Sequence, residues 1–211
     1  MRECVKLFLS MDEVTIYILH TSLVKKNISF VSSYVDPKRK EKAERYLQEK
    51  DRLLSFGAAY LLKKYLPNEE IKESNTGKPF LVNGPSFNIS HSGEYAALAI
   101  HPKRDVGVDN ERIVENKIDG IRFILNDDEK KITDLSTLFL IWSNRESLVK
   151  CLGTGIRDIK KISGLPLEGI RMVDNVHYYT KSLIYDNYSL SVTLKGKEPF
   201  NIIVNIIDNL E

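Results

Sequence analysis

The chain has 211 residues, of which 42% are hydrophobic and 28% are charged, a composition typical of one compact domain or of two small ones. Its net charge of +2 excludes the strongly basic domain of a dedicated nucleic-acid binder. No apolar run approaches a membrane span, and Cys4 and Cys151 have neither zinc-site nor disulfide-framework spacing. The apolar stretch Val5–Leu9 is too short for a signal peptide, so we expect a cytoplasmic protein.

The first half of the chain is expected to begin with a strand and continue with helices. Val14–Leu19 is rich in β-branched and aromatic residues, which predicts a β-strand. Asp36 followed by Pro37 indicates the N-cap and first turn of a helix. Asp51 is expected to cap a second helix, whose apolar residues recur at helical spacing up to Pro67. Short strands are then expected at residues 80–82, 87–89, 95–100 and 106–108.

The second half starts similarly, with helices followed by strands. Helical segments are expected at residues 117–125 and 127–133, before a strong helix over Leu138–Leu152 that ends at Gly153. Strands are expected at residues 177–180, 182–185, 188–194 and 201–207. Together these patterns predict an α+β fold of two similar halves, residues 1–103 and 104–211, each with helices packed on an antiparallel sheet.

Two acidic residues follow the strand that begins at Val106. Asp109 and Glu111 are two residues apart, so on a strand both carboxylates project from one face, where Gly107 leaves room beside them. Paired carboxylates without a basic residue between them suit a hard cation such as Mg²⁺. A solvated strand end is the alternative that this pair alone leaves open.

Glu146 and Lys150 lie on the predicted long helix, four residues apart and therefore on one face. A surface ion pair worth about 0.2–0.5 kcal/mol is the plain interpretation. If Glu146 reaches Asp109 and Glu111, it supplies a third oxygen ligand for the cation. Lys150, one turn further on, can then meet a phosphate.

Three further features could bind an anion. The small polar run Asn88–Gly93 follows a strand and contains His91, a possible phosphate donor, although a turn with a satisfied histidine fits equally well. Arg39, Lys42 and Arg45 are three residues apart and share a helix face, which is usually just a solvated face. Lys78 is a lone loop lysine.

Taken together, the order and spacing of these segments resemble the signature blocks of the 4′-phosphopantetheinyl transferases. The blocks are Gly77-Lys-Pro79, Phe87-Asn-Ile-Ser-His-Ser-Gly93, Val106-Gly-Val-Asp-Asn-Glu111 and Trp142-Ser-Asn-Arg-Glu-Ser-Leu-Val-Lys150. The upstream segment from Asp36 to Ser55 also fits the larger, pseudo-dimeric (Sfp-type) branch. The resemblance spans roughly residues 36–156 and implies two α+β halves related by a pseudo-twofold axis, with the site between them.

The resemblance also implies roles for individual residues. It places Mg²⁺ on Asp109, Glu111 and Glu146, with Glu146 and Lys150 as the catalytic residues. Whether Glu146 is the base or only a ligand stays open. It implies that coenzyme A is bound through its phosphates by Arg39, Lys42, Ser55, Lys78, Ser90 and His91.

The implied activity is transfer of the 4′-phosphopantetheine group of coenzyme A to a serine of an acyl or peptidyl carrier protein, with release of 3′,5′-ADP. A monomer is expected, with no nucleic-acid or membrane partner; the pathway that the carrier serves stays open. The sequence departs from the family pattern at Asn110, Arg145 and Ser147. Asn110 and Arg145 leave a non-catalytic relative, which binds coenzyme A or a carrier protein, as the alternative.

Overall fold

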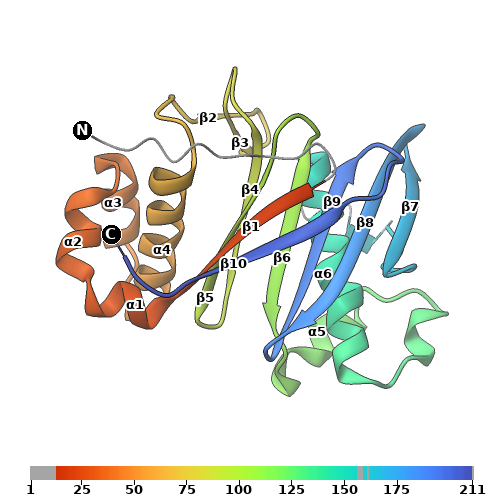
Figure 1. Cartoon of the computed structure of the whole chain (residues 1–211). Coiled ribbons are helices and arrows are strands. Elements are labelled where there is room, and N and C mark those ends of the chain that lie inside the picture. The colour runs from red at the N-terminus through yellow and green to blue at the C-terminus, as the bar shows by residue number, and fades with distance from the viewer. Residues whose placement is uncertain (1–12, 156–158, 161, 211) are drawn as a thin grey trace.

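The computed structural model describes residues 13–155, 159–160 and 162–210, which form four layers: helices, two β-sheets and a further helical layer (Figure 1). The first layer holds helices α1 Thr21–Lys26, α2 Ile28–Tyr34, α3 Pro37–Glu44 and α4 Glu49–Tyr65. The last layer holds α5 Ile118–Arg122, α6 Leu135–Leu152 and the 3₁₀ turns Glu115–Lys117 and Glu129–Lys131.

The first sheet has the strand order β10-β1-β5-β4 and the second has the order β6-β9-β8-β7. Strands of the first sheet are β1 Glu13–His20, β4 Ser86–Ser92, β5 Tyr95–His101 and β10 Asn201–Ile207. Strands of the second are β6 Val106–Arg112, β7 Glu168–Val173, β8 Val176–Tyr185 and β9 Tyr188–Lys195. A small hairpin, β2 Lys72–Glu73 and β3 Pro79–Phe80, lies apart from both.

The last strand returns to the first sheet. β10 pairs with β1 in parallel, from Glu13 opposite Asn201 to Leu19 opposite Ile207, whereas the other pairs in the two large sheets are antiparallel. The mixed helix-and-sheet fold agrees with the sequence prediction, but the C-terminal segment is part of a sheet built mainly by the N-terminal half. The division at residues 103 and 104 and the pseudo-twofold relation remain predictions.

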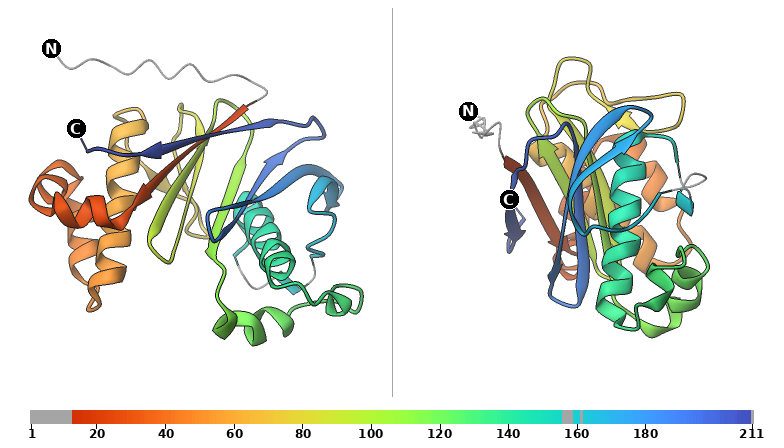
Figure 2. Two further views of the ribbon diagram at one scale, coloured as in Figure 1. Left: turned by 60° about the horizontal axis from the view of Figure 1, so that its bottom comes forward. Right: turned by 90° about the vertical axis from the view of Figure 1, so that its right-hand side faces the viewer.

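Two cores hold the layers together. One face of the first sheet, including Leu19 and Leu98, packs against α1–α4, and its other face packs against the second sheet through residues such as Ile16 and Val192. The opposite face of the second sheet carries α6, as the turned views show (Figure 2). The site lies where these layers meet, at neighbouring strands β4 and β6.

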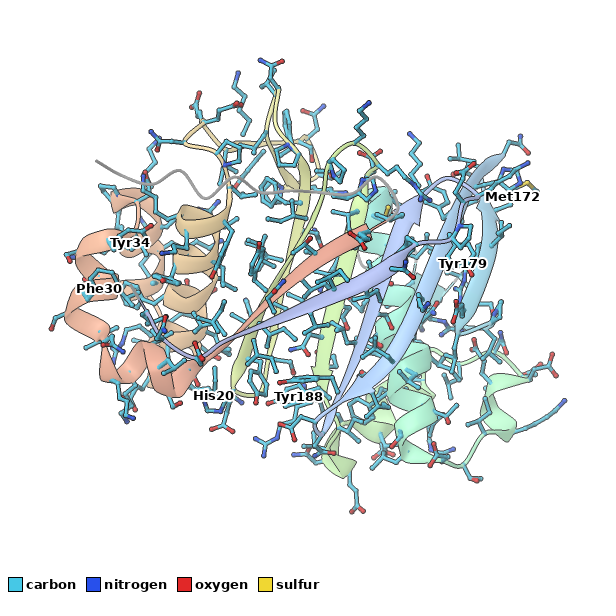
Figure 3. All side chains as sticks on the ribbon, viewed as in Figure 1. His20, Phe30, Tyr34, Met172, Tyr179 and Tyr188 are labelled. Carbon is cyan, nitrogen blue, oxygen red and sulfur yellow. The ribbon has the colours of Figure 1, made fainter. Side chains whose placement is uncertain are left out.

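The turn between β4 and β5 is anchored to the second sheet. Tyr188 Oη accepts a hydrogen bond from the Glu94 N–H at 2.9 Å, and its ring meets the edge of Tyr95. Figure 3 shows Tyr188 and His20 toward the same end of the two sheets, and the rings of both residues contact Tyr95. This contact ties the end of β4 to the start of β9, which pairs with β6 at Arg112.

Several predicted boundaries are confirmed. Asp36 caps α3 with Pro37 in its first turn, and Gly153 ends α6 in the left-handed conformation, at φ 73°. Asp51 is not an N-cap, because α4 begins at Glu49 after Gln48 and Asp51 lies inside its first turn. The predicted strand at 87–89 extends to Ser92 as β4. In the described ranges, no helix is long and apolar enough to cross a membrane.

Candidate functional site

Helix α6 lies directly against strand β6 at Gly107. A Cβ atom at this position would lie 2.0 Å from the Ser147 carbonyl oxygen and 2.4 Å from the Cys151 backbone nitrogen. Since neither backbone atom can move without shifting the helix, only glycine fits there. The close approach brings Lys150 of α6 against Asp109 of β6.

Hydroxyl pairs hold the same helix on the sheet. Ser143 Oγ lies 2.7 Å from Ser191 Oγ, and Ser147 Oγ lies 2.8 Å from Thr193 Oγ1, all four residues being fully buried. Because buried hydroxyls need hydrogen-bond partners, these pairs fix the rotation of α6 about its axis. Ser147, a departure from the family pattern, therefore has a structural partner in β9.

Lys150 and Asp109 form an ion pair inside the site. Lys150 Nζ lies 2.6 Å from Asp109 Oδ1 and 3.1 Å from Ser90 Oγ. Asp109 is buried, while the Lys150 side chain is 27% exposed and thus accessible to a bound molecule. The second Asp109 oxygen, Oδ2, is buried and has no hydrogen-bond partner in the described part of the chain.

Glu146 lies one turn before Lys150, and its environment favours the neutral form. Burial, followed by the nearby Asp109 carboxylate, raises the pKa of Glu146 to about 7, although Lys150 opposes the shift. Its Oε1 atom is buried and, among the described residues, lacks a hydrogen-bond partner. A carboxylate with a pKa near neutrality is suited to accept a proton.

Glu111 completes the set of acids. Its Oε2 atom accepts hydrogen bonds from Ser92 Oγ and from Lys117 Nζ, each at 2.8 Å. Glu111 also contributes to the raised pKa of Glu146, which places the two carboxylates within electrostatic range. Lys150 thus contacts Asp109, and Glu146 lies within electrostatic range of Asp109 and Glu111; their joint use as one site stays a prediction.

His91 lies within electrostatic range of this group, whereas no described contact places Ser55 beside it. The His91 side chain reaches the surface, yet burial of its ring, followed by the Lys150 ammonium, lowers the pKa of His91. Asp51, on the first turn of α4, acts electrostatically on the same imidazole and opposes this shift. Ser55, one turn further along α4, is half-buried.

The basic residues of α3 are placed differently from one another. Arg39 is half-buried; burial lowers its pKa, while Asp36 and Glu73 oppose that shift. Lys42 is exposed, and Arg45 follows the end of α3 and pairs with Glu41. No bond described here links Arg39 or Lys42 to the acids, so their role in binding phosphate stays a prediction.

Lys78 is engaged with the backbone. Its Nζ donates to the carbonyl oxygens of Cys151 at 2.9 Å and of Val106 at 3.2 Å. These bonds satisfy a carbonyl in the last turn of α6, where the helix dipole favours a cation. Lys78 thus joins α6 to the start of β6, and its predicted contact with coenzyme A remains untested.

Arg145 points away from the acids. Its guanidinium donates to the Ile124 carbonyl and to the Glu129 carboxylate, and both charged side chains are fully buried. Glu129 also accepts from the backbone N–H groups of Asn126 at 2.9 Å and Gly164 at 2.6 Å. The arginine therefore organises the segments around α6 and does not extend the charged group of the site.

Asn110 is buried on the face of β6 opposite Asp109. Its Nδ2 has no hydrogen-bond partner within the described residues. Leaving this buried polar group unsatisfied costs roughly 1–3 kcal/mol.

The carboxylate oxygens in this site are the type of ligand that a hard cation prefers. Asp109 Oδ2 and Glu146 Oε1 are buried carboxylate oxygens without partners in the described chain, and oxygen ligands are what Mg²⁺ prefers. Among the described residues, however, no three His, Cys, Asp or Glu side chains converge closely enough to hold a metal ion by themselves. Oxygens of a bound phosphate would have to supply part of the coordination.

This fold and site define an α+β protein with a buried aspartate, two partly buried glutamates and a lysine, groups suited to cation and phosphate chemistry. No protein-family model matches the chain. The chain is 34% identical over 145 residues to the 4′-phosphopantetheinyl transferase gsp of Aneurinibacillus migulanus. The aligned region covers 61% of this chain and 60% of that protein.

Two eukaryotic relatives extend the comparison. The chain is 26% identical over 156 residues to the L-aminoadipate-semialdehyde dehydrogenase-phosphopantetheinyl transferase of Xenopus laevis, with 58% of this chain and 50% of that protein covered. It is 26% identical over 161 residues to a phosphopantetheinyl transferase of a Thraustochytrium species, with 60% and 55% covered. The chain thus spans between 50% and 60% of the length of these relatives. They confirm the resemblance predicted from the motifs: the chain is a relative of the 4′-phosphopantetheinyl transferases.

The sequence analysis missed three residues that the structure connects to the site or to its supporting helix. Ser92 and Lys117 contact Glu111, and Glu129 binds Arg145. Ser92 lies in the segment Phe87–Gly93, next to His91. Its spacing of two residues from Ser90 indicates that both serines share one strand face, and this was a usable signal. Glu129 carried no signal, because its partner is 16 residues away along the chain.

Proposed function

We propose that this protein transfers the 4′-phosphopantetheine group of coenzyme A to a serine hydroxyl of a carrier protein, with Mg²⁺ as cofactor and 3′,5′-ADP as the second product. The observation that carries the proposal is the arrangement at Glu146, a half-buried carboxylate one helical turn from Lys150, whose ammonium pairs with Asp109; its pKa is raised to about 7. The relatives named as phosphopantetheinyl transferases support the group that is transferred.

Each residue has a task in this reaction. A serine hydroxyl is a weak nucleophile, so Glu146 accepts its proton as it attacks the pyrophosphate of coenzyme A. Lys150 faces the leaving phosphate and offsets its growing negative charge. Asp109, Glu111 and Glu146 would hold Mg²⁺, which supplies further charge stabilisation when bound.

The half-buried Arg39 and exposed Lys42 of α3, together with Ser55, Lys78, Ser90 and His91, bind the phosphates of coenzyme A in this proposal. Ser90 and His91 are favoured because Ser90 touches Lys150 and the Lys150 charge acts on His91. The proposal includes a cytoplasmic enzyme that acts as a monomer on a protein partner.

The test is incubation of the purified protein with coenzyme A, Mg²⁺ and a panel of apo carrier proteins, read by intact mass. We expect one phosphopantetheine to be added to at least one carrier. Binding of coenzyme A without any mass gain across a broad panel would favour the non-catalytic relative. Arg145 no longer supports that alternative, since its charge is satisfied by Glu129 outside the site.

A further inference from the structure

Strands β4 and β6 are joined by side chains of β4 and backbone groups of β6. The N–H groups of Val106, Val108, Asn110 and Arg112 donate at 3.0–3.1 Å to side-chain oxygens of residues 20 positions earlier. The accepting side chains are Ser86, Asn88, Ser90 and Ser92. Alternate small polar side chains of β4 thus accept the hydrogen bonds that the carbonyl oxygens of a paired strand would normally accept.

Two of these hydroxyls also contact the acids. Ser90 Oγ donates to Asp109 Oδ1 at 3.0 Å, and Ser92 Oγ donates to Glu111 Oε2 at 2.8 Å. A serine hydroxyl has one hydrogen to donate and lone pairs that accept. Because the β6 N–H occupies an acceptor position, the hydrogen is free to point to the carboxylate of the preceding residue.

The geometry points to Ser92 as a positioning residue that holds Glu111 for the cation of the transfer reaction. Ser90 plays the same part for Asp109, but it also touches Lys150 and belongs to the proposed coenzyme pocket. Ser92 has no such second task among its described contacts. This inference rests on the proposed function and adds to it a residue outside the expected ligand set.

Glu111 needs such a partner because it is only partly enclosed. Its side chain is 21% exposed, and its other described partner, Lys117, is a surface lysine with a side chain that is 49% exposed. A flexible surface lysine restrains a carboxylate weakly, since holding it costs side-chain entropy. The buried Ser92 hydroxyl, fixed by the Arg112 N–H, restricts the Glu111 rotamer at much lower cost.

Ser86 provides a matched control. Its Oγ accepts from the Val106 N–H at 3.1 Å, as Ser92 Oγ accepts from Arg112. Among the described contacts it makes no bond to a carboxylate; the acid at that register, Asp105, pairs with Lys195 at 3.6 Å. Ser86→Ala removes a bond between β4 and β6, whereas Ser92→Ala removes the equivalent bond and the contact to Glu111.

The experiment is calorimetric titration of Mg²⁺ into the full chain with saturating coenzyme A, for the unchanged protein and the Ser92→Ala, Ser92→Thr and Ser86→Ala variants. Loss of a partner that orients a metal ligand typically weakens metal binding 10–100-fold. We expect Ser92→Ala to raise the Mg²⁺ dissociation constant about tenfold, with coenzyme A affinity unchanged. Ser92→Thr keeps the hydroxyl and should restore most of the affinity, and Ser86→Ala should leave it unchanged.

Equal Mg²⁺ affinity in Ser92→Ala and Ser86→Ala would overturn the role of Ser92 while leaving the proposed transfer reaction intact. Absence of Mg²⁺ binding by the unchanged protein would instead overturn the cation site itself, and Ser92 with it. If Ser92→Ala fails to fold, Ser92→Cys preserves packing with a weaker donor, and an unchanged Mg²⁺ affinity in that variant would likewise refute the inference.

Discussion

The Lys150 ammonium lies 2.6 Å from the Asp109 carboxylate, a contact across 41 residues of sequence that joins α6 to β6 in the middle of the site. The contact depends on how closely the helix approaches the strand. That approach is set by Gly107, where a Cβ would meet the backbone of α6.

Replacing Gly107 should therefore damage the site through the helix. Gly107→Ala places a Cβ 2.0 Å from the Ser147 carbonyl oxygen, which forces α6 away from β6. We expect the unfolding free energy to fall by about 1–3 kcal/mol, the typical cost of overpacking. The transfer rate should fall by a larger fraction than the unfolding free energy, because the displaced helix carries Glu146 and Lys150. Gly120→Ala is the control, because nothing lies within 4 Å of its added Cβ. Denaturant unfolding and rate assays of both variants check this, and equal behaviour would disprove the close-approach argument.

The proposed role of Glu146 as proton acceptor can be separated from its proposed role as a Mg²⁺ ligand. Glu146→Gln keeps size but removes both charge and basicity, so the transfer rate should fall strongly while the fold persists. Asp109→Asn should also lower the rate, but excess Mg²⁺ should partly restore it because only ligation is impaired. The measurement is rate against Mg²⁺ concentration for both variants. Equal rescue would leave Glu146 as a ligand only, and full activity of Glu146→Gln would remove it from the site.

Glu146 should also make stability depend on pH. The pKa of Glu146 is about 7 in the fold against an ordinary value of 4.5, so between these pH values the folded state binds more protons than the unfolded state. The contribution of Glu146 to the unfolding free energy is therefore largest at low pH, and it falls as the pH rises to about 7. Relative to the unchanged protein, Glu146→Gln should gain about 1–2 kcal/mol at pH 8, reduced from the full shift by solvent at a half-buried group, and little at pH 4. Urea unfolding in metal-free buffer at both pH values tests this; a pH-independent difference would contradict it.

The buried pair of Arg145 and Glu129 should be costly to break on one side. Arg145→Met leaves the Glu129 carboxylate buried without its counter-charge, with an expected loss of about 3–5 kcal/mol. The double variant Arg145→Met/Glu129→Gln removes both charges and keeps an amide oxygen for the Gly164 N–H, so it should recover part of that loss. Denaturant unfolding of the single and double variants decides the matter. A double variant less stable than Arg145→Met would show that the charge pair is not the source of the effect.

His91 and Arg39 are expected to bind the phosphates of coenzyme A. Replacing either by alanine should weaken coenzyme A binding by roughly 1.5–3 kcal/mol, the range for hydrogen bonds to charged groups, and should affect carrier binding less. Isothermal titration with coenzyme A and separately with an apo carrier measures the two effects. Normal coenzyme A binding by His91→Ala would make the histidine a strand residue of β4 without a ligand role.

Local pattern was sufficient for several elements. The Asp36–Pro37 pair and Gly153 predicted a helix start and a helix end that the structure bears out, because caps depend on residues adjacent in sequence. Period two in β6 placed Asp109 and Glu111 on one face for the same reason. The start of α4 was predicted at the wrong residue, since Asp51 is as good a cap by type but lies within the first turn of the helix.

The sequence by itself determined the order of the motifs, the resemblance they carry and the shared strand face of Asp109 and Glu111. Each of those depends on residue type and short spacing. Only the tertiary structure decided that β10 completes the first sheet, that Lys78 binds the carbonyls of Val106 and Cys151, and that Ser92 holds Glu111. These contacts join residues on different elements, and which elements meet depends on how the layers pack, so no local periodicity encodes them.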